Sequence, residues 1–258
     1  MISNIQKFRK QLAAKELCLG AGITLNDPVV VEALSEMVDF VWIDTEHTPM
    51  GIETLLGQLI AARAAGMPAL VRVPGSDLNV LKRILDTGAE GIIVPQVRTV
   101  EEVQGVVDAC RYPPMGNRGW GPRRPSNYGK YSRAQIVQGS NEELFVSVQI
   151  ESTEALENLD EIVKIQGLDS IAIGPQDLSG SLGMLGQVDH PTVQEAIQTI
   201  IQKSHAAGLP VGLGSEGEAK TAAHWAEMGA NWIQCGSDFS YMLNNIAELF
   251  SQVRSKMK

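Results

Sequence analysis

The run Val146-Ser147-Val148-Gln149-Ile150-Glu151, with its counterpart Ser170-Ile171-Ala172-Ile173-Gly174-Pro175-Gln176-Asp177, decides the fold. Each run is apolar, is rich in β-branched residues and breaks off at a carboxylate, and the segment between them has helical composition. This pattern predicts two neighbouring parallel strands joined by a helix. Because parallel strands end at the same edge of a sheet, we expect Glu151 and Asp177 to emerge side by side.

The same alternation extends over the whole chain. Short apolar runs, typical of buried parallel strands, are separated by amphipathic helical stretches, and several of these end at a glycine suited to a helix C-terminus. The predicted strands span residues 18–24, 40–44, 69–73, 91–97, 144–150, 170–174, 210–214 and 232–236. The predicted helices include residues 5–14, 52–65, 79–85, 100–110, 154–165, 192–207 and 241–253.

Eight strands alternating with helices in 258 residues predict a (β/α)₈ barrel, and we expect residues 1–258 to form a single domain with a short lead-in helix and a C-terminal helix. The competing fold is an open doubly wound sheet, which usually carries a glycine-rich fingerprint after its first strand. The segment Leu25-Asn26-Asp27-Pro28 has no such fingerprint, so the barrel is favoured.

The composition excludes several classes of function. The net charge of −9 repels phosphate backbones and argues against a nucleic-acid partner. Three widely spaced cysteines form neither a disulfide framework nor a zinc knuckle. The N-terminal residues show no signal-peptide pattern and no apolar run reaches the length of a membrane span, so we expect a cytoplasmic protein that does not enter the membrane.

Polar side chains follow the predicted strands at the end where barrel enzymes carry their active sites. Glu151 and Asp177 supply the oxygen ligands that a hard divalent cation prefers. The alternative is that each merely caps the helix that follows it. Two carboxylates at equivalent places in successive units favour a metal site.

His47 directly follows a strand and lies near Asp44, so it is a candidate base, although a structural role at a helix entry is the alternative. Arg72 lies inside an apolar strand and must be paired or face a polar pocket. An ion pair with Asp44 or Glu46 would satisfy it without any function.

Glycines around 212–214 and 236–238 suggest a phosphate site, which the acidic Glu216 and Asp238 weaken. Lys82, Lys164, Lys203 and Lys220 all fall in helical stretches, which disfavours imine chemistry.

Over roughly residues 18–245 the chain resembles the HpcH/HpaI aldolase family of metal-dependent 2-oxo-acid aldolases. The resemblance is carried by segments that are specific only when taken together and in this order: Ile43-Asp44-Thr45-Glu46-His47, Val71-Arg72-Val73-Pro74, Arg111-Tyr112-Pro113-Pro114, Arg118-Gly119, Gln149-Ile150-Glu151 and Gly174-Pro175-Gln176-Asp177-Leu178.

The resemblance implies a class II aldolase that reversibly cleaves a 4-hydroxy-2-oxo acid to pyruvate and an aldehyde through a metal-stabilised enolate. It implies Glu151 and Asp177 as ligands of Mg²⁺, Mn²⁺ or Co²⁺, with Asp177 also contacting substrate. Gln149 and Gln176 are the further substrate contacts that it implies.

The resemblance also assigns catalytic roles. His47 is the proton acceptor, oriented by Asp44, and Asp86 raises its basicity, within its own subunit or from a neighbouring one. Arg72 binds substrate and stabilises the transition state. Homotrimers or hexamers with active sites near subunit contacts are implied as well.

The irregular stretch Tyr112–Tyr128 is expected either to fold over the active-site mouth, where Trp120–Ser126 would shape the aldehyde pocket, or to reach a neighbouring subunit. Two other functions remain open. One is a lyase acting on a CoA ester, with Arg123 and Arg124 as the only candidates to bind the CoA phosphates. The other is a non-catalytic barrel that binds a 2-oxo acid.

Overall fold

The computed structural model describes residues 4–257 and forms one closed barrel of eight parallel strands, each hydrogen-bonded to the next and the last to the first. The (β/α)₈ prediction is confirmed. The strands are β1 (Cys18–Ile23), β2 (Phe40–Asp44), β3 (Ala69–Arg72), β4 (Gly91–Val94), β5 (Phe145–Ile150), β6 (Ser170–Ile173), β7 (Val211–Ser215) and β8 (Trp232–Ser237).

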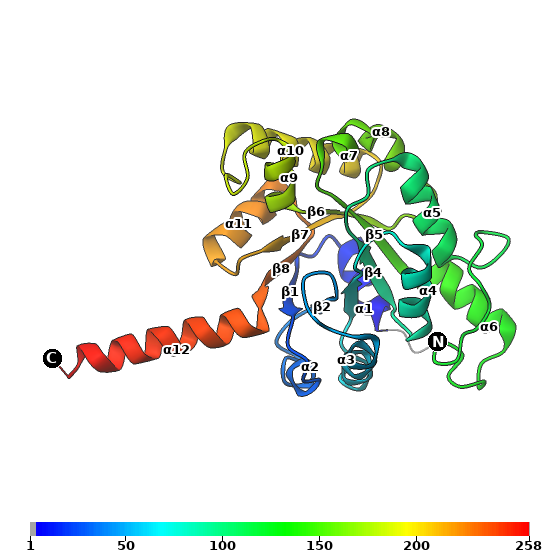
Figure 1. The fold of residues 1–258 in the computed structure, drawn as a ribbon, viewed down its shortest axis with the longest axis horizontal. Helices are drawn as coiled ribbons and strands as arrows, with labels where there is room; N and C mark the ends of the chain where they lie inside the picture. The colour runs from blue at the N-terminus through cyan, green and yellow to red at the C-terminus, as the bar shows by residue number, and fades with distance from the viewer. Residues whose placement is uncertain (1–3, 258) are drawn as a thin grey trace.

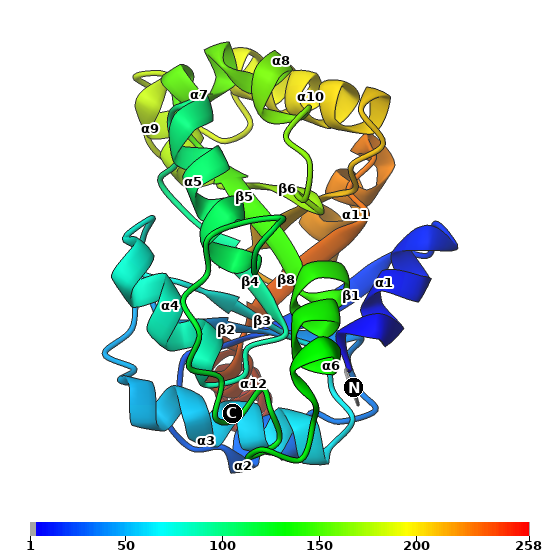
Figure 2. The same ribbon diagram turned by 90° about the vertical axis from the view of Figure 1, so that its right-hand side faces the viewer.

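Helices surround the barrel, as Figure 2 shows. They are α1 (Ile5–Ala13), α2 (Val29–Ala33), α3 (Ile52–Ala64), α4 (Leu78–Asp86), α5 (Val100–Cys110), α6 (Arg133–Gln138), the π-helical turn η1 (Gly139–Glu143), α7 (Thr153–Glu157), α8 (Leu159–Ile162), α9 (Pro175–Ser181), α10 (Pro191–Ala206), α11 (Ala219–Met228) and α12 (Asp238–Ser255).

Two buried clusters hold the fold together. The larger lies between the outer face of the sheet and the helices, where strand residues such as Val71 and Ile171 pack against helix residues such as Leu55 and Ile197. The smaller fills the barrel, where Phe40, Trp42, Leu70, Ile93, Phe145, Ala172 and Trp232 pack together. Phe8 of α1 lies against the rings of Phe40, Phe145 and Trp232, so the lead-in helix closes the N-terminal end of the barrel.

The predicted helix ends agree with the backbone. Gly66, Gly88, Gly167, Gly208 and Gly229 all have positive φ, between 65° and 113°, which glycine adopts at little cost. One prediction needs refinement: residues 154–165 form two short helices, α7 and α8, with Asn158 as the C-cap of one and the N-cap of the next.

The C-terminal helix α12 leaves the barrel instead of packing along it (Figure 1). It begins directly after β8, and its exposed apolar side chains fall on one stripe: Phe239, Met242, Leu243, Ile246, Leu249, Phe250 and Val253. Across residues 4–257, no helix has both the length and the apolar character required to cross a bilayer.

Candidate active site

The carboxyl-terminal end of the barrel carries unlike side chains on its two sides. Large polar groups from β2, β3 and β5 fill one side: Asp44, Arg72 and Gln149, with Glu151 directly after β5. Glycines occupy the corresponding inner positions on the other side: Gly22, Gly174 and Gly214. Charged side chains therefore occupy one side of the mouth, whereas the other side, which we call the hollow side, is lined by glycines and by the side chain of Gln234.

Asp44 and Arg72 are register partners on the neighbouring strands β2 and β3, and their side chains form a two-point ion pair. Nε of Arg72 donates to Oδ1 of Asp44 at 2.9 Å, and Nη2 donates to Oδ2 at 2.8 Å. The guanidinium also stacks 5.4 Å from the centre of the Trp42 ring. Burial works to lower the pKa of Arg72, but the hydrogen bonds to Asp44 and the charges of Asp44 and Glu46 raise it overall, so the cation is fixed in place.

Glu46 and His47 follow this pair. Oε2 of Glu46 lies 3.2 Å from Nη1 of Arg72 and 3.6 Å from Nε2 of His47. Asp44 holds this segment through the backbone, because its Oδ1 accepts hydrogen bonds from the N–H groups of Glu46 and His47 at 3.0 and 3.4 Å. The His47 side chain is 63% exposed, so its ring is accessible to a substrate.

Glu151 is 3% exposed and both of its carboxylate oxygens are held. The main-chain N–H of Gln96 donates to Oε1, and the side-chain amide of Gln149 donates to Oε2. This arrangement rules out the capping alternative for Glu151, since Ser152 is the residue that caps α7. Asp177 lies in the first turn of α9, whose N-cap is Gly174, so the helix-start alternative remains open for that residue.

The carboxylates of this site interact electrostatically. The pKa of Glu151 is raised to about 7, chiefly by burial; the Gln96 hydrogen bond and the charge of Arg72 oppose the rise, and the charges of Asp177 and Glu46 contribute to it. Burial also raises the pKa of Glu46 against the opposing charges of Arg72 and His47. A concentration of carboxylates that raises their own pKa values is the environment that a divalent cation relieves.

Gly174 makes room for the Glu151 carboxylate. Glu151 and Gly174 directly follow the register partners Ile150 and Ile173 of β5 and β6. A Cβ atom at residue 174 would lie 2.2 Å from Oε2 of Glu151 and 2.5 Å from Nε2 of Gln149. The residues present therefore fit a small cation with oxygen ligands. Among the described residues, however, no group of three or more His, Cys, Asp or Glu side chains is placed to hold a metal by itself.

The two predicted glutamine contacts come from neighbouring strands, Gln149 from β5 and Gln176 from the turn after β6. Gln149 is buried beside Glu151, and its Oε1 has no hydrogen-bond partner. Gln176 is exposed at the start of α9, and its Nε2 lies 3.3 Å from Oε1 of Glu216. A cavity of about 770 Å³ adjoins Gln176 and extends over the ends of β7 and β8.

Asp86 lies apart from this cluster. It is the last residue of α4, which ends at the N-terminal end of the barrel, and its Oδ1 is 3.3 Å from Nη2 of Arg118. Within one copy of the chain Asp86 pairs with Arg118 and not with His47, so of the two alternatives for its role, action from a neighbouring subunit is the one that stays a prediction. The irregular stretch 112–128 lies at this same end, where Arg124 donates to the carbonyls of Thr87 and Leu59. The expectation that it covers the mouth of its own barrel is therefore wrong.

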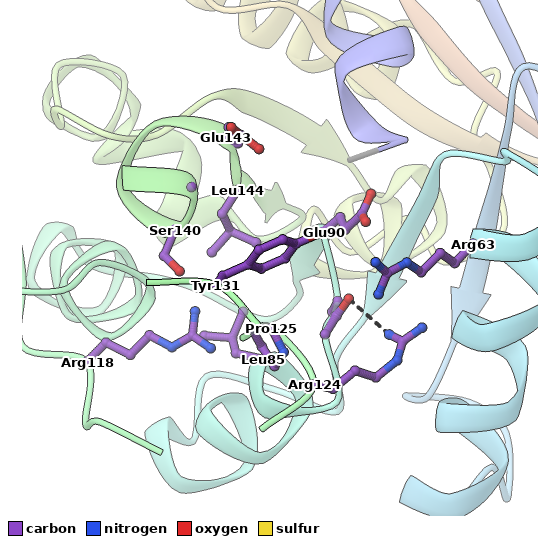
Figure 3. A pocket seen from close by; sticks show the side chains of 13 residues that line it. Arg63, Leu85, Glu90, Arg118, Arg124, Pro125, Tyr131, Ser140, Glu143 and Leu144 are labelled. Atoms are coloured by element: carbon purple, nitrogen blue, oxygen red, sulfur yellow. Dashed lines mark hydrogen bonds between the residues drawn. The ribbon is translucent and has the colours of Figure 1, made fainter. Parts of the chain in front are cut away.

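Figure 3 shows a cavity at that N-terminal end, where the side chains of Arg63, Arg118 and Arg124 lie near those of Glu90 and Glu143. Its volume is about 70 Å³, enough for little more than water. Its three arginines face two glutamates, and Arg118 is paired with Asp86 outside this lining, so the charges balance. We interpret this cavity as part of the packing.

The phosphate site considered near residues 236–238 has a structural explanation. The Asp238 carboxylate accepts hydrogen bonds from the N–H groups of Thr24 and Leu25, both at 2.9 Å, and from the Thr24 hydroxyl at 2.6 Å. The Asp238 carboxylate therefore takes these hydrogen bonds in place of a bound phosphate, and it links the end of β1 to the start of α12.

Reasoning from sequence missed two residues that the structure brings into the mouth: Gln96, whose N–H holds Glu151, and Gln234, which faces Gly22 and Gly214. It expected Glu46 only as an ion-pair partner of Arg72, whereas the carboxylate lies between Arg72 and His47. The strand-end position of Glu46 was a usable signal. The role of Gln96 depends on a backbone conformation, with φ of 59°, which the side chain does not reveal.

Comparisons with known proteins agree with this geometry. Residues 23–245 match the family model described as HpcH/HpaI aldolase/citrate lyase. The chain belongs to this family. A 5-keto-4-deoxy-D-glucarate aldolase from Escherichia coli O139:H28 (strain E24377A / ETEC) is 36% identical over 252 residues, which are 95% of this chain and 97% of that protein.

Solved structures of the family superpose closely. An HpcH/HpaI aldolase/citrate lyase family protein from Burkholderia cenocepacia J2315 has a TM-score of 0.90 and 31% identity, covering 98% of this chain and all (100%) of that one. An HpcH/HpaI aldolase from Desulfitobacterium hafniense DCB-2 has a TM-score of 0.89 and 30% identity, covering 95% and 96%. This member of the HpcH/HpaI family is thus an enzyme, a carbon–carbon lyase of the aldolase type.

Proposed function

We propose that the enzyme reversibly cleaves a 4-hydroxy-2-oxo acid to pyruvate and an aldehyde, and that it uses a divalent metal ion. The observation that carries this proposal is the grouping of a fixed cation, Arg72, an accessible base, His47, and a buried carboxylate, Glu151, at the carboxyl ends of β3, β2 and β5. Barrel enzymes carry their active sites at this end.

Glu151 and Asp177 are the residues that would hold the metal. Mg²⁺, Mn²⁺ and Co²⁺ all accept carboxylate oxygens, and two protein ligands leave positions for the carboxylate and keto oxygens of a 2-oxo acid. When bound, the ion would act as a Lewis acid toward the keto group. The room that Gly174 leaves beside Glu151 supports this assignment.

In cleavage, a proton leaves the C4 hydroxyl, the C3–C4 bond breaks, and its electron pair forms the enolate of pyruvate, which then takes a proton at C3. The exposed imidazole of His47 accepts the hydroxyl proton. Arg72 donates hydrogen bonds toward the oxygen that gains negative charge, and its pairing with Asp44 fixes its orientation beforehand. Gln149 and Gln176 would contact the substrate from the ends of the neighbouring strands β5 and β6, and Asp177 would contact it as well.

Asp86 keeps a proposed role only through another copy of the chain. Since it lies with Arg118 away from its own His47, any effect on the basicity of a histidine requires a neighbouring subunit. We propose a homo-oligomer, a trimer or hexamer, and the exposed apolar stripe of α12 supports it because water disfavours such a surface on a separate chain.

The alternative of a CoA-ester lyase loses its support. Arg124 is buried, its guanidinium binds backbone carbonyls, and it lies with Arg123 at the end of the barrel opposite to Glu151. A non-catalytic binder would not need an accessible base beside a fixed cation.

Chelation tests the proposal directly. Enzyme stripped with EDTA should release no pyruvate from 4-hydroxy-2-oxopentanoate, and Mn²⁺ or Co²⁺ should restore the release. Release that persists after complete chelation would rule out the metal assignment. Inactivation by borohydride in the presence of pyruvate would instead reveal an imine-forming lysine.

A further inference from the structure

We propose that the aldehyde part of the substrate occupies the hollow side of the mouth, over β6, β7 and β8, and that this hollow selects an uncharged, hydroxylated aldehyde over one that carries a carboxylate. This inference rests on the proposed aldolase function and names its second substrate. It starts from the cavity of about 770 Å³ beside Gln176.

The cavity lies next to the proposed metal site along the chain. Gln176, which lines the cavity, and Asp177, the proposed ligand, are neighbours at the start of α9. Gly214 and Gln234 line the cavity from the inner face of β7 and β8. The other side of the mouth is filled by the ion pair of Asp44 and Arg72, so the hollow side is the space available for the group beyond C4.

The cavity wall has negative charge from three elements and no compensating arginine or lysine among its described residues. Its carboxylates are Asp189 before α10, Glu216 after β7 and Glu218 at the start of α11. The only basic side chain in the wall is His190, whose Nδ1 caps α10 by accepting from the Thr192 N–H. A carboxylate on the aldehyde would therefore be repelled.

The same wall offers hydrogen bonds to hydroxyl groups. The amides of Gln176 and Gln234 line it, and the Ser215 hydroxyl is buried without a hydrogen-bond partner. Unsatisfied buried polar atoms are costly, and a bound hydroxyl group relieves that cost. Because the cavity wall repels anions and offers hydrogen-bond partners, we expect the second substrate to be a neutral hydroxyaldehyde.

The test compares glyceraldehyde with tartronate semialdehyde, which differ in whether the third carbon is a hydroxymethyl group or a carboxylate. With pyruvate and Mn²⁺ at low ionic strength, where charges act over about 30 Å, kcat/KM for glyceraldehyde should exceed that for tartronate semialdehyde by roughly tenfold or more. Glu216→Gln should reduce this ratio several-fold, and added salt should reduce it in the wild type.

Glu227→Gln is the matched control, since Glu227 is exposed on α11 and lies outside the cavity wall. It should leave the ratio unchanged. Equal or better use of tartronate semialdehyde by the wild type would overturn the selection by charge. A ratio that responds no more to Glu216→Gln than to Glu227→Gln would overturn the placement of the aldehyde.

A separate measurement checks the proposed function itself. Exchange of the pyruvate methyl protons with deuterium needs no aldehyde and reports enolate formation alone. Absence of exchange in the metal-loaded wild type would contradict the aldolase proposal. Exchange without reaction of either aldehyde would contradict only the inference about the second substrate.

Discussion

The main-chain N–H of Gln96 donates a 2.7 Å hydrogen bond to Oε1 of Glu151, and Gln96 adopts a left-handed φ of 59° at this position. Side chains other than glycine, asparagine and aspartate rarely adopt this conformation, and strained backbone of this kind clusters at functional sites. The bond orients the Glu151 carboxylate from the loop that follows β4.

We expect Gln96→Val to destabilise the protein by about 1–2 kcal/mol, because a β-branched residue tolerates positive φ poorly. It should also weaken Mn²⁺ binding, since the N–H that holds Glu151 is displaced. Gln96→Gly is the control and should keep both properties. Urea unfolding and calorimetric titration measure them, and equal behaviour of the two variants would show that the bend does not matter.

Gly174→Ala should lose metal binding. Its Cβ would meet the Glu151 carboxylate at 2.2 Å, and such overpacking costs about 1–3 kcal/mol. Gly105→Ala, in the middle of α5 with open space around it, is the comparison and should stabilise the protein by about 0.5–1 kcal/mol. Thermal unfolding with and without Mn²⁺ separates the two effects; a metal-dependent shift that survives in Gly174→Ala would contradict the assignment.

Stability of the metal-free protein should depend on the protonation of Glu151. Its pKa is raised from 4.5 to about 7, so the folded state binds the proton more tightly than the unfolded state. The resulting stability is full below pH 4.5 and is lost as pH rises through about 7.

Glu151→Gln removes this dependence. At pH 8 the metal-free variant should be more stable than the wild type by on the order of 2–3 kcal/mol, with the difference vanishing near pH 4. The unpartnered Oε1 of Gln149 can accept from the new amide. Melting temperatures at the two pH values measure the effect, and a variant less stable than the wild type at pH 8 would refute it.

Arg72→Lys should lower kcat for pyruvate release roughly hundredfold or more. A lysine cannot reproduce the two-point contact with Asp44, so positive charge remains but its orientation is lost. Arg123→Lys, exposed at the other end of the barrel, serves as the control and should keep full activity. A small loss in Arg72→Lys would mean that charge alone suffices.

Ile246→Asp should reduce the mass measured by light scattering, because it places a charge in the middle of the apolar stripe of α12. Asn244→Asp, one helical face away, makes a similar change in charge and should leave the mass unchanged. An unaltered mass for Ile246→Asp would show that α12 does not join subunits.

The sequence allowed the barrel and the positions of most site residues to be predicted, because hydrophobic period and strand ends are local signals. The β2 strand, residues 40–44, appears with the predicted limits. The sequence left open whether Arg72 pairs with Asp44 or with Glu46, and in the structure it pairs with both.

Other features depend on tertiary placement. Asp86 has the local sequence of any helix end, and only the closed barrel shows that it lies away from His47. The direction taken by α12 is also invisible in its own residues, since an amphipathic helix serves equally well against its own barrel or beyond it.

The glycines on one side of the mouth separate the selection of the aldehyde from the chemistry of bond cleavage, two properties that many enzymes combine in the same residues. A methyl group added at Gly22 would meet Gln234 and the carbonyl of Gly236, and one added at Gly214 would meet Gln234, so neither would touch Arg72 or Glu151. Directed evolution at these two positions can thus change which aldehydes the enzyme accepts, while the catalytic residues stay the same.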